Sequence, residues 1–197
     1  MSAPERTRVA PGAAGARVGR VSLDIVELAA RQGRADELAA VAAAQGIVLP
    51  SFGTASVTAS AVTLAVRPGR WLVLAEPHSP GTLAAHWAQH LAAAGTAVDL
   101  SSALTALRLS GPSYREVLVR GCRLDLDSAA FGSRAAAATL MAQVSVTLAS
   151  LGDGMLLLTP STTARHFEEW LCATATPFGV ERQSLLPFTC LCGDPSS

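Results

Sequence analysis

The apolar residues of this chain fall into short runs, and one pair of runs occurs twice. Residues 62–65 (VTLA) are followed by a Pro-Gly turn and a second apolar run at residues 71–74 (WLVL). The same arrangement returns 84 residues later, where residues 146–149 (VTLA) precede a Gly-Asp-Gly turn and residues 155–158 (MLLL). Runs of this length between turn residues are typical of buried strands. The sequence therefore predicts two copies of a β-hairpin, one in each half of the chain.

Each predicted hairpin is followed by a helix that carries a tryptophan. In the first half, apolar residues recur at every fourth position of residues 80–94, on the face that carries Trp87. In the second half, a final helix that contains Trp170 follows Ser161, a candidate N-cap. A helix with one apolar stripe buries that stripe against a neighbouring layer. The duplicated unit is thus strand, turn, strand, helix.

The remaining elements are expected between and before these units. In chain order they are a strand at 21–30, a helix at 35–45, a strand at 57–66, a strand near Val98, a strand at 104–109, a helix at 112–120 and a long strand at 135–149. Residues 21–30 also fit a helix, but we favour a strand. This order predicts an α+β fold of two pseudo-repeated split βαβ (ferredoxin-like) halves.

The domain boundaries follow from the same pattern. Residues 1–20 are rich in Ala, Gly and Pro, which predicts a flexible N-terminal tail. Residues 21–182 are expected to form a single α+β domain of two repeated halves. Residues 183–197 are expected to form a flexible C-terminal tail.

Composition and charge narrow the classes of function. Half of the residues are apolar, and 15 basic residues balance 15 acidic ones. A net charge of zero offers no electrostatic footprint for nucleic acid or an anionic membrane, and it favours association with other chains. The sequence shows no signal peptide, no run of apolar residues long enough to span a bilayer, and no disulfide framework. We therefore expect a cytoplasmic protein with reduced cysteines.

Metal-ligating residue types are present, but their spacing is incomplete. His86 and His90 are four residues apart, as two ligands on one helix face would be, yet no third ligand follows. Cys190 and Cys192 form one short pair where structural zinc requires four ligands. We favour exposed histidines, here and at His166, and a free dithiol. Two further cysteines are expected to be small buried hydrophobic residues, namely Cys122 and Cys172.

The other candidate residues are better explained by structure than by chemistry. No Gly-x-Ser-x-Gly nucleophile elbow occurs, and the glycines near the N-terminus lack a preceding strand, which argues against a dinucleotide site. These glycines are Gly12, Gly15 and Gly19. The carboxylates near strand ends are expected to cap turns; they are Asp99, Asp125, Asp127 and Asp153. The tryptophans are expected to pack in the core before they serve any partner; they are Trp71, Trp87 and Trp170. The sequence thus assigns no catalytic, cofactor-binding or metal residue.

The segment at residues 98–126 resembles the gamma subunit of heterotetrameric sarcosine oxidase. It contains an Asp-x-Ser segment at Asp99, a strand, Gly111-Pro112, a helix, and the turn RGCRLDL at residues 120–126. The run RPGRWLVL at residues 67–74 and the region around Trp170 agree as well, and the likeness covers about residues 21–180. That family is similar to the folate-binding aminomethyltransferase domains of the glycine cleavage system.

The resemblance implies a fold and a role in a complex. It implies a non-catalytic subunit that assembles with alpha, beta and delta subunits. The complex oxidises sarcosine to glycine, hydrogen peroxide, and formaldehyde or 5,10-methylenetetrahydrofolate. The resemblance places NAD, FAD and FMN on alpha and beta, tetrahydrofolate on alpha and zinc on delta, with no cofactor in this chain. The sequence departs from the family at residues 189–192 (TCLC).

Three alternatives stay open at this level. The chain could be a stand-alone folate-binding module, or a gamma-type subunit of an oxidase or dehydrogenase that acts on another N-methyl amino acid. The third is an independent metal-dependent enzyme that uses His86, His90 and the Cys190–Cys192 pair.

Overall fold

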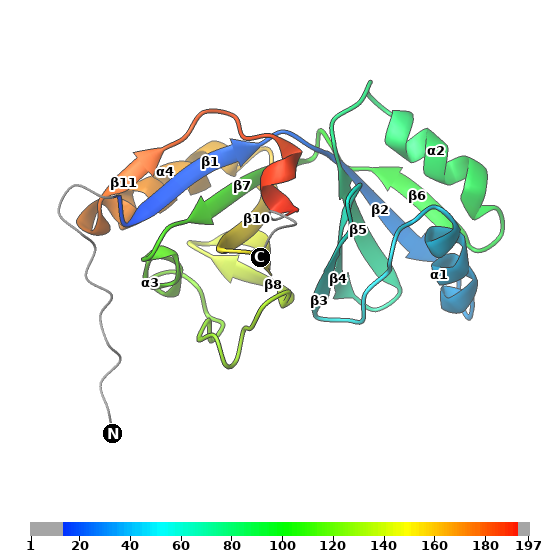
Figure 1. Ribbon diagram of the computed structural model, residues 1–197, viewed down its shortest axis with the longest axis horizontal. Coiled ribbons are helices and arrows are strands. Elements are labelled where there is room, and N and C mark those ends of the chain that lie inside the picture. The colour runs from blue at the N-terminus through cyan, green and yellow to red at the C-terminus, as the bar shows by residue number, and fades with distance from the viewer. Residues whose placement is uncertain (1–13, 193–197) are drawn as a thin grey trace.

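The computed structural model describes residues 14–192, which form two β-sheets with helices on their outer faces (Figure 1). The first sheet has the strand order β3-β4-β5-β2-β6. Its strands are β2 (Asp24–Ala30), β3 (Thr54–Val57), β4 (Val62–Arg67), β5 (Arg70–Ala75) and β6 (Gly95–Asp99). The helices α1 (Ala35–Ala44) and α2 (Thr82–Leu91) cover its outer face.

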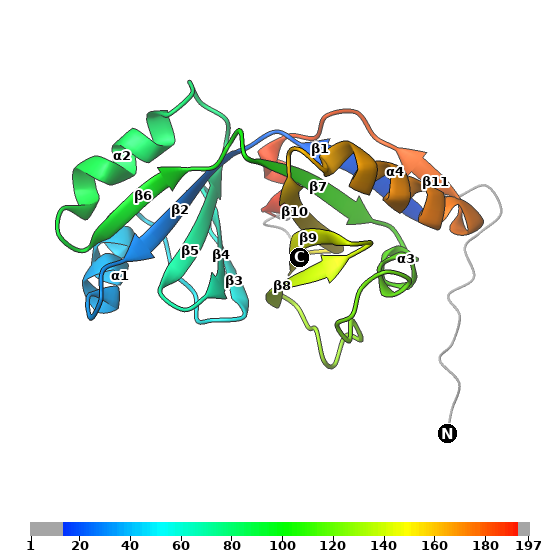
Figure 2. The same cartoon turned by 180° about the vertical axis from the view of Figure 1, so that it is seen from behind.

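The second sheet has the strand order β11-β1-β7-β10-β9-β8. Its strands are β1 (Ala16–Val21), β7 (Leu104–Ser110), β8 (Ala136–Met141), β9 (Val144–Leu151), β10 (Gly154–Pro160) and β11 (Val180–Arg182). The helices α3 (Tyr114–Val119) and α4 (Ala164–Ala175) lie on its outer face, as Figure 2 shows from behind. Two short 3₁₀ helices, η1 (Thr176–Phe178) and η2 (Phe188–Leu191), follow α4.

The two halves share one strand topology, except that one strand of the second sheet comes from the start of the chain. The predicted hairpins are confirmed as β4–β5 and β9–β10, and β3 and β8 occupy matching edges. Next to β2 lies β6, whereas next to β7 lies β1 from the start of the chain. The chain therefore crosses between the sheets twice, from β1 to β2 and from β6 to β7 (Figure 1). The predicted α+β class with two ferredoxin-like halves is confirmed.

Burial on both faces explains the uninterrupted apolar runs. In β10, Met155 and Leu157 pack against the helices of the second sheet, while Leu156 and Leu158 point into the space between the sheets. Successive side chains of a strand point to opposite faces, so a strand covered on both sides has no face turned to solvent and is mostly apolar. The core between the sheets draws residues from both of them, and it joins the two halves.

The predicted tails are wrong where the structure describes them. Residues 16–20 belong to β1, where Ala16 and Val18 are buried against the helices of the second sheet. In the C-terminal segment, Phe188 and Leu191 are each 2% exposed and fill the core between the sheets. Apolar side chains are thus what fixes both segments. Residues 1–13, with Gly12, and residues 193–197 lie outside the described part of the chain.

Three predicted strands have different bounds. The strand favoured at 21–30 is confirmed from Asp24 on as β2, but its predicted start is wrong, because Val21 ends β1 in the other sheet. The predicted strand at 57–66 is likewise divided between β3 and β4. The predicted long strand at 135–149 is the hairpin β8–β9, whose turn residues Ala142 and Gln143 have φ values of 50° and 66°. Such turns usually contain Gly or Asn, so this one carries no sequence signal.

The helices α2, α3 and α4 begin later than predicted, whereas α1 begins at Ala35 as predicted. The N-cap of α4 is Thr163 and not Ser161, and neither α2 nor α3 begins at its proline. In α2, Trp87 and Leu91 are buried against the first sheet, as the fourfold spacing predicts. Among residues 14–192, no helix is both long and apolar enough to cross a lipid bilayer.

Candidate functional site

A cleft of about 500 Å³, called here the first cleft, opens between the two sheets. One wall comes from β5, with Trp71 and Leu72, and the other from β8 and β9, with Leu140 and Val146. Most of its lining residues are apolar. The charged residues are on the side of the first sheet, where Arg70 donates a hydrogen bond of 2.5 Å to Glu27. The first cleft is therefore shaped for an apolar group with a charged rim.

A larger cleft of about 1260 Å³, called the second cleft, lies by the C-terminal segment. Its lining includes Arg108 on β7, Arg134 before β8, Asp153 in the β9–β10 turn, and Cys190. The side chain of Arg108 is 10% exposed, and its Nη2 atom donates a 2.5 Å hydrogen bond to Asp153. The sequence predicts that Asp153 lies in the turn, but it assigns no role to Arg108. The sequence signal that could have indicated Arg108 is its charge, because it is the one charged residue in the strand LTALRLS.

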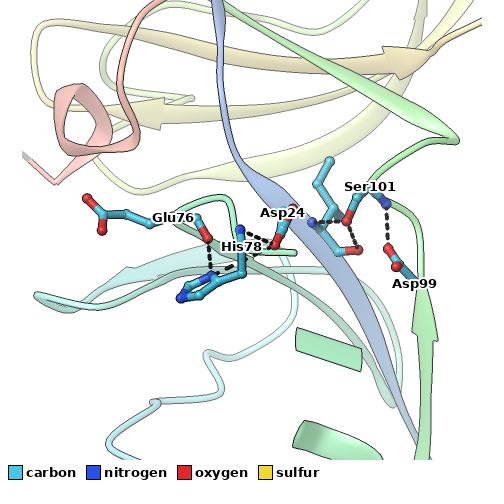
Figure 3. A network of polar contacts seen from close by, with 6 residues as sticks. Asp24, Glu76, His78, Asp99 and Ser101 are labelled. Atoms are coloured by element: carbon cyan, nitrogen blue, oxygen red, sulfur yellow. Dashed lines mark hydrogen bonds and ion pairs between the residues drawn. The ribbon is translucent and has the colours of Figure 1, made fainter. Parts of the chain in front are cut away.

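A polar network stands where the chain crosses between the sheets (Figure 3). The backbone N–H of Ile25 donates to the Ser101 hydroxyl at 3.0 Å, and the N–H of Ser101 donates to Asp99 at 2.9 Å. The N–H of His78 donates to Asp24 at 2.8 Å. The hydrogen bonds from the side chain and backbone of Ser101 lower the pKa of Asp99. The interpretation of Asp99 as a residue that orients a loop is confirmed.

The carboxylates at residues 125 and 127 also hold a turn. Asp125 accepts a hydrogen bond from the N–H of Asp127 at 2.9 Å, and Asp127 accepts one from the N–H of Ala129 at 2.8 Å. Nearby, the Arg115 guanidinium donates to the backbone carbonyls of Leu126 and Phe131. These contacts hold the loop between α3 and β8 in place. Both carboxylates therefore have a structural role.

The histidine pair is exposed on α2. The rings of His86 and His90 have centroids 4.5 Å apart, and Nδ1 of His90 lies 2.8 Å from the carbonyl oxygen of His86. His166 is exposed on α4, in the other half. Within residues 14–192, no group of three or more His, Cys, Asp or Glu residues is placed to hold a metal ion.

The four cysteines are free thiols in three places. Cys190 and Cys192 lie beside the second cleft and pack against the core between the sheets. Cys172 is buried on α4, while Cys122 is partly buried near α3. Burial raises the pKa of all four thiols, which keeps them protonated at neutral pH.

The tryptophans pack within their own halves. Trp71 donates from its indole N–H to the carbonyl oxygen of Pro50 at 2.9 Å, and Trp87 is 2% exposed. Both belong to the core between the first sheet and its helices. Trp170 stacks on Phe167 with ring centroids 5.7 Å apart, in the corresponding core of the second sheet. The expectation that they serve the core is confirmed.

Comparison with known proteins identifies relatives of this chain. No protein-family profile matches it. The sarcosine oxidase gamma subunit of an Arthrobacter species is 34% identical over 146 residues, which are 71% of this chain and 70% of that protein. A chain of heterotetrameric sarcosine oxidase from Corynebacterium sp. U-96 superposes with a TM-score of 0.75 and 27% identity, over 84% of this chain and 86% of that chain.

The fold is shared more widely. Aminomethyltransferase T of the glycine cleavage system from Bartonella henselae superposes with a TM-score of 0.64 and 16% identity. The match covers 86% of this chain and 48% of that one. At this identity the likeness concerns the fold alone. The identity to the Arthrobacter subunit, its coverage of both chains and the matching two-sheet structure together show that this chain belongs to the sarcosine oxidase gamma-subunit family.

Proposed function

We propose that this chain is the gamma subunit of a heterotetrameric sarcosine oxidase and that its role in the complex is structural. The observation that carries the proposal is the 34% identity to a sarcosine oxidase gamma subunit over 70% of that protein. The TM-score of 0.75 to a chain of the heterotetrameric enzyme supports it.

The proposed complex oxidises sarcosine with molecular oxygen. Sarcosine, oxygen and water give glycine, formaldehyde and hydrogen peroxide, or the one-carbon unit is transferred to tetrahydrofolate as 5,10-methylenetetrahydrofolate. In the proposal the alpha and beta subunits carry FAD, FMN, NAD and tetrahydrofolate, and delta carries zinc. This chain carries none of them and contributes to assembly.

The positions of the reactive groups support a structural role. Asp99 and Asp125 accept hydrogen bonds from backbone N–H groups of their own turns. A thiol with a raised pKa is a poor nucleophile at neutral pH, and burial raises the pKa of Cys190 and Cys192. The rings of His86 and His90 are on the exposed side of α2, away from both clefts.

Reconstitution tests this function. The alpha, beta and delta subunits of the same host are co-expressed with and without this chain, and sarcosine-dependent peroxide is measured after purification and after mild heating. We expect the full set to be active, the set without this chain to assemble poorly or lose activity on heating, and the isolated chain to make no peroxide. Equal yield, activity and heat resistance without this chain would overturn the proposal. N-methylglutamate and dimethylglycine in place of sarcosine test the related substrates.

A second candidate function rests on the first cleft. Its apolar walls, which include Leu72 and Val146, could receive a flat ring, which favours the stand-alone folate-binding module. A ligand that binds only the folded state raises the thermal midpoint. Tetrahydrofolate should then raise the midpoint of the isolated chain, and p-aminobenzoylglutamate, which lacks the pterin, should not. An unchanged midpoint at saturating tetrahydrofolate would remove this candidate.

A further inference from the structure

Arg108 is a buried cation in the middle of the second sheet. Leu107 and Leu109 on either side of it pack against the helices, so Arg108 faces the space between the sheets. The residue is 8% exposed. Its Nη2 atom donates to Asp153, but its buried Nη1 atom has no hydrogen-bond partner among the described residues.

This arrangement leaves the guanidinium incompletely paired. A buried donor without an acceptor is unfavourable, and a buried charge needs both an opposite charge and satisfied hydrogen bonds. Asp153 supplies one acceptor, and its side chain is 78% exposed, so solvent screens much of its charge. A second acceptor that carries negative charge would complete the pairing of Arg108.

The second cleft provides the space and a second cation. Its volume is about 1260 Å³, and both Arg108 and Arg134 line it. Arg134 is exposed, and none of the described carboxylates forms an ion pair with it. Planar guanidinium groups match the oxygens of carboxylates and phosphates. We propose that Arg108 and Arg134 form a binding site for a small oxyanion, a phosphate or a carboxylate, in the second cleft.

Anion titration tests the site independently of any oxidase activity. The full chain is titrated with sodium phosphate, and separately with sodium acetate, at constant ionic strength set with sodium chloride. Saturable binding is followed by calorimetry and by the thermal midpoint. Cys190 lines the same cleft, so phosphate should also slow its alkylation, as measured by mass spectrometry of the modified peptide.

Variants distinguish this site from general anion binding. We expect R108Q to weaken phosphate binding about tenfold or more and R134Q to weaken it less, because each removes a charge-assisted donor. D153N should strengthen binding, since it removes a competing carboxylate. R165Q alters an exposed arginine that pairs with Glu169 on α4, and it should bind as the unaltered chain does.

The test compares the phosphate affinities of several variants, so it does not require R108Q to fold. If R108Q is unfolded, weaker binding by R134Q and tighter binding by D153N support the site. The proposal is overturned if phosphate and acetate both give no saturable binding. It is also overturned if R134Q and D153N bind as R165Q does, or if Cys190 alkylates at the same rate with and without phosphate.

Discussion

Gly121, which follows α3, lies directly against the indole ring of Trp170 on α4. A Cβ atom at Gly121 would be 2.4 Å from Cζ2 and 2.6 Å from Cη2 of that ring. Atoms at such distances overlap, so the absence of a side chain at residue 121 sets how closely the two helices pack over the second sheet.

Replacing this glycine with alanine should destabilise the protein. We expect G121A to lower the free energy of unfolding by about 1–3 kcal/mol, the usual cost of overpacking a dense core. Urea unfolding followed by tryptophan fluorescence measures it. G132A is the matched control, because a Cβ there is 3.4 Å from its nearest neighbour, the carbonyl oxygen of Ser128. Equal stability of the two variants would contradict the packing argument.

The C-terminal segment should contribute to stability. Phe188 is 2% exposed between the sheets, and truncating a buried phenylalanine to alanine costs about 3–5 kcal/mol. F188A is therefore expected to lower the midpoint of urea unfolding strongly. Leu185 in the same segment is 66% exposed, and L185A should change stability by less than about 0.5 kcal/mol. A flexible segment would instead give two variants with the stability of the unaltered chain.

Removing the Ser101 hydroxyl should raise the pKa of Asp99. The Ser101 side chain lowers this pKa more than any other neighbouring group does, because it stabilises the charged carboxylate. Carboxyl ¹³C titration by NMR should show Asp99 titrating at higher pH in S101A than in the unaltered chain. S133A, an exposed serine far along the sequence, is the control. If Asp99 titrates at the same pH in S101A, the assignment of the shift to Ser101 is wrong.

Stability should fall in alkaline solution. Burial raises the pKa of Cys190 and Cys192 above the ordinary thiol value of 9.0. In the unfolded chain these thiols ionise first, so the unfolded state binds fewer protons and stability decreases as pH rises. The contribution is fully present below the ordinary thiol pKa and is lost as pH rises through the folded one.

Urea unfolding at pH 7.5 and 10, with reductant, measures this decrease. The double variant C190A/C192A should lose less stability between the two pH values than the unaltered chain. The single variant H86A, which leaves the thiols in place, should lose as much. An equal loss in the double variant would assign the alkaline effect to other groups.

The repeated hairpins and their helices could be predicted because their signals are local. Leu156 and Leu157 are both buried, and a short apolar run between turn residues is typical of a strand covered on both faces. Trp87 marks a helix by its spacing from Leu91. The placement of β1 in the second sheet has no such signal, because the local pattern of residues does not determine which sheet a strand joins.

The second cleft could not be predicted for the same reason. Arg108, Arg134 and Cys190 come from three separate segments, and only the tertiary fold brings them to one cavity. The burial of the C-terminal segment could not be predicted, because its runs of apolar residues are short and follow no helix or strand period. Their burial depends on the gap between two sheets, which no local pattern describes.

Native mass spectrometry of the co-expressed subunits tests the central claim most directly. This chain, tagged and expressed with the alpha, beta and delta subunits of its host, is purified through its tag and its mass is measured under non-denaturing conditions. We predict a single heterotetramer that holds one copy of each subunit. A spectrum that shows this chain alone, while the other three subunits assemble without it, would contradict the account.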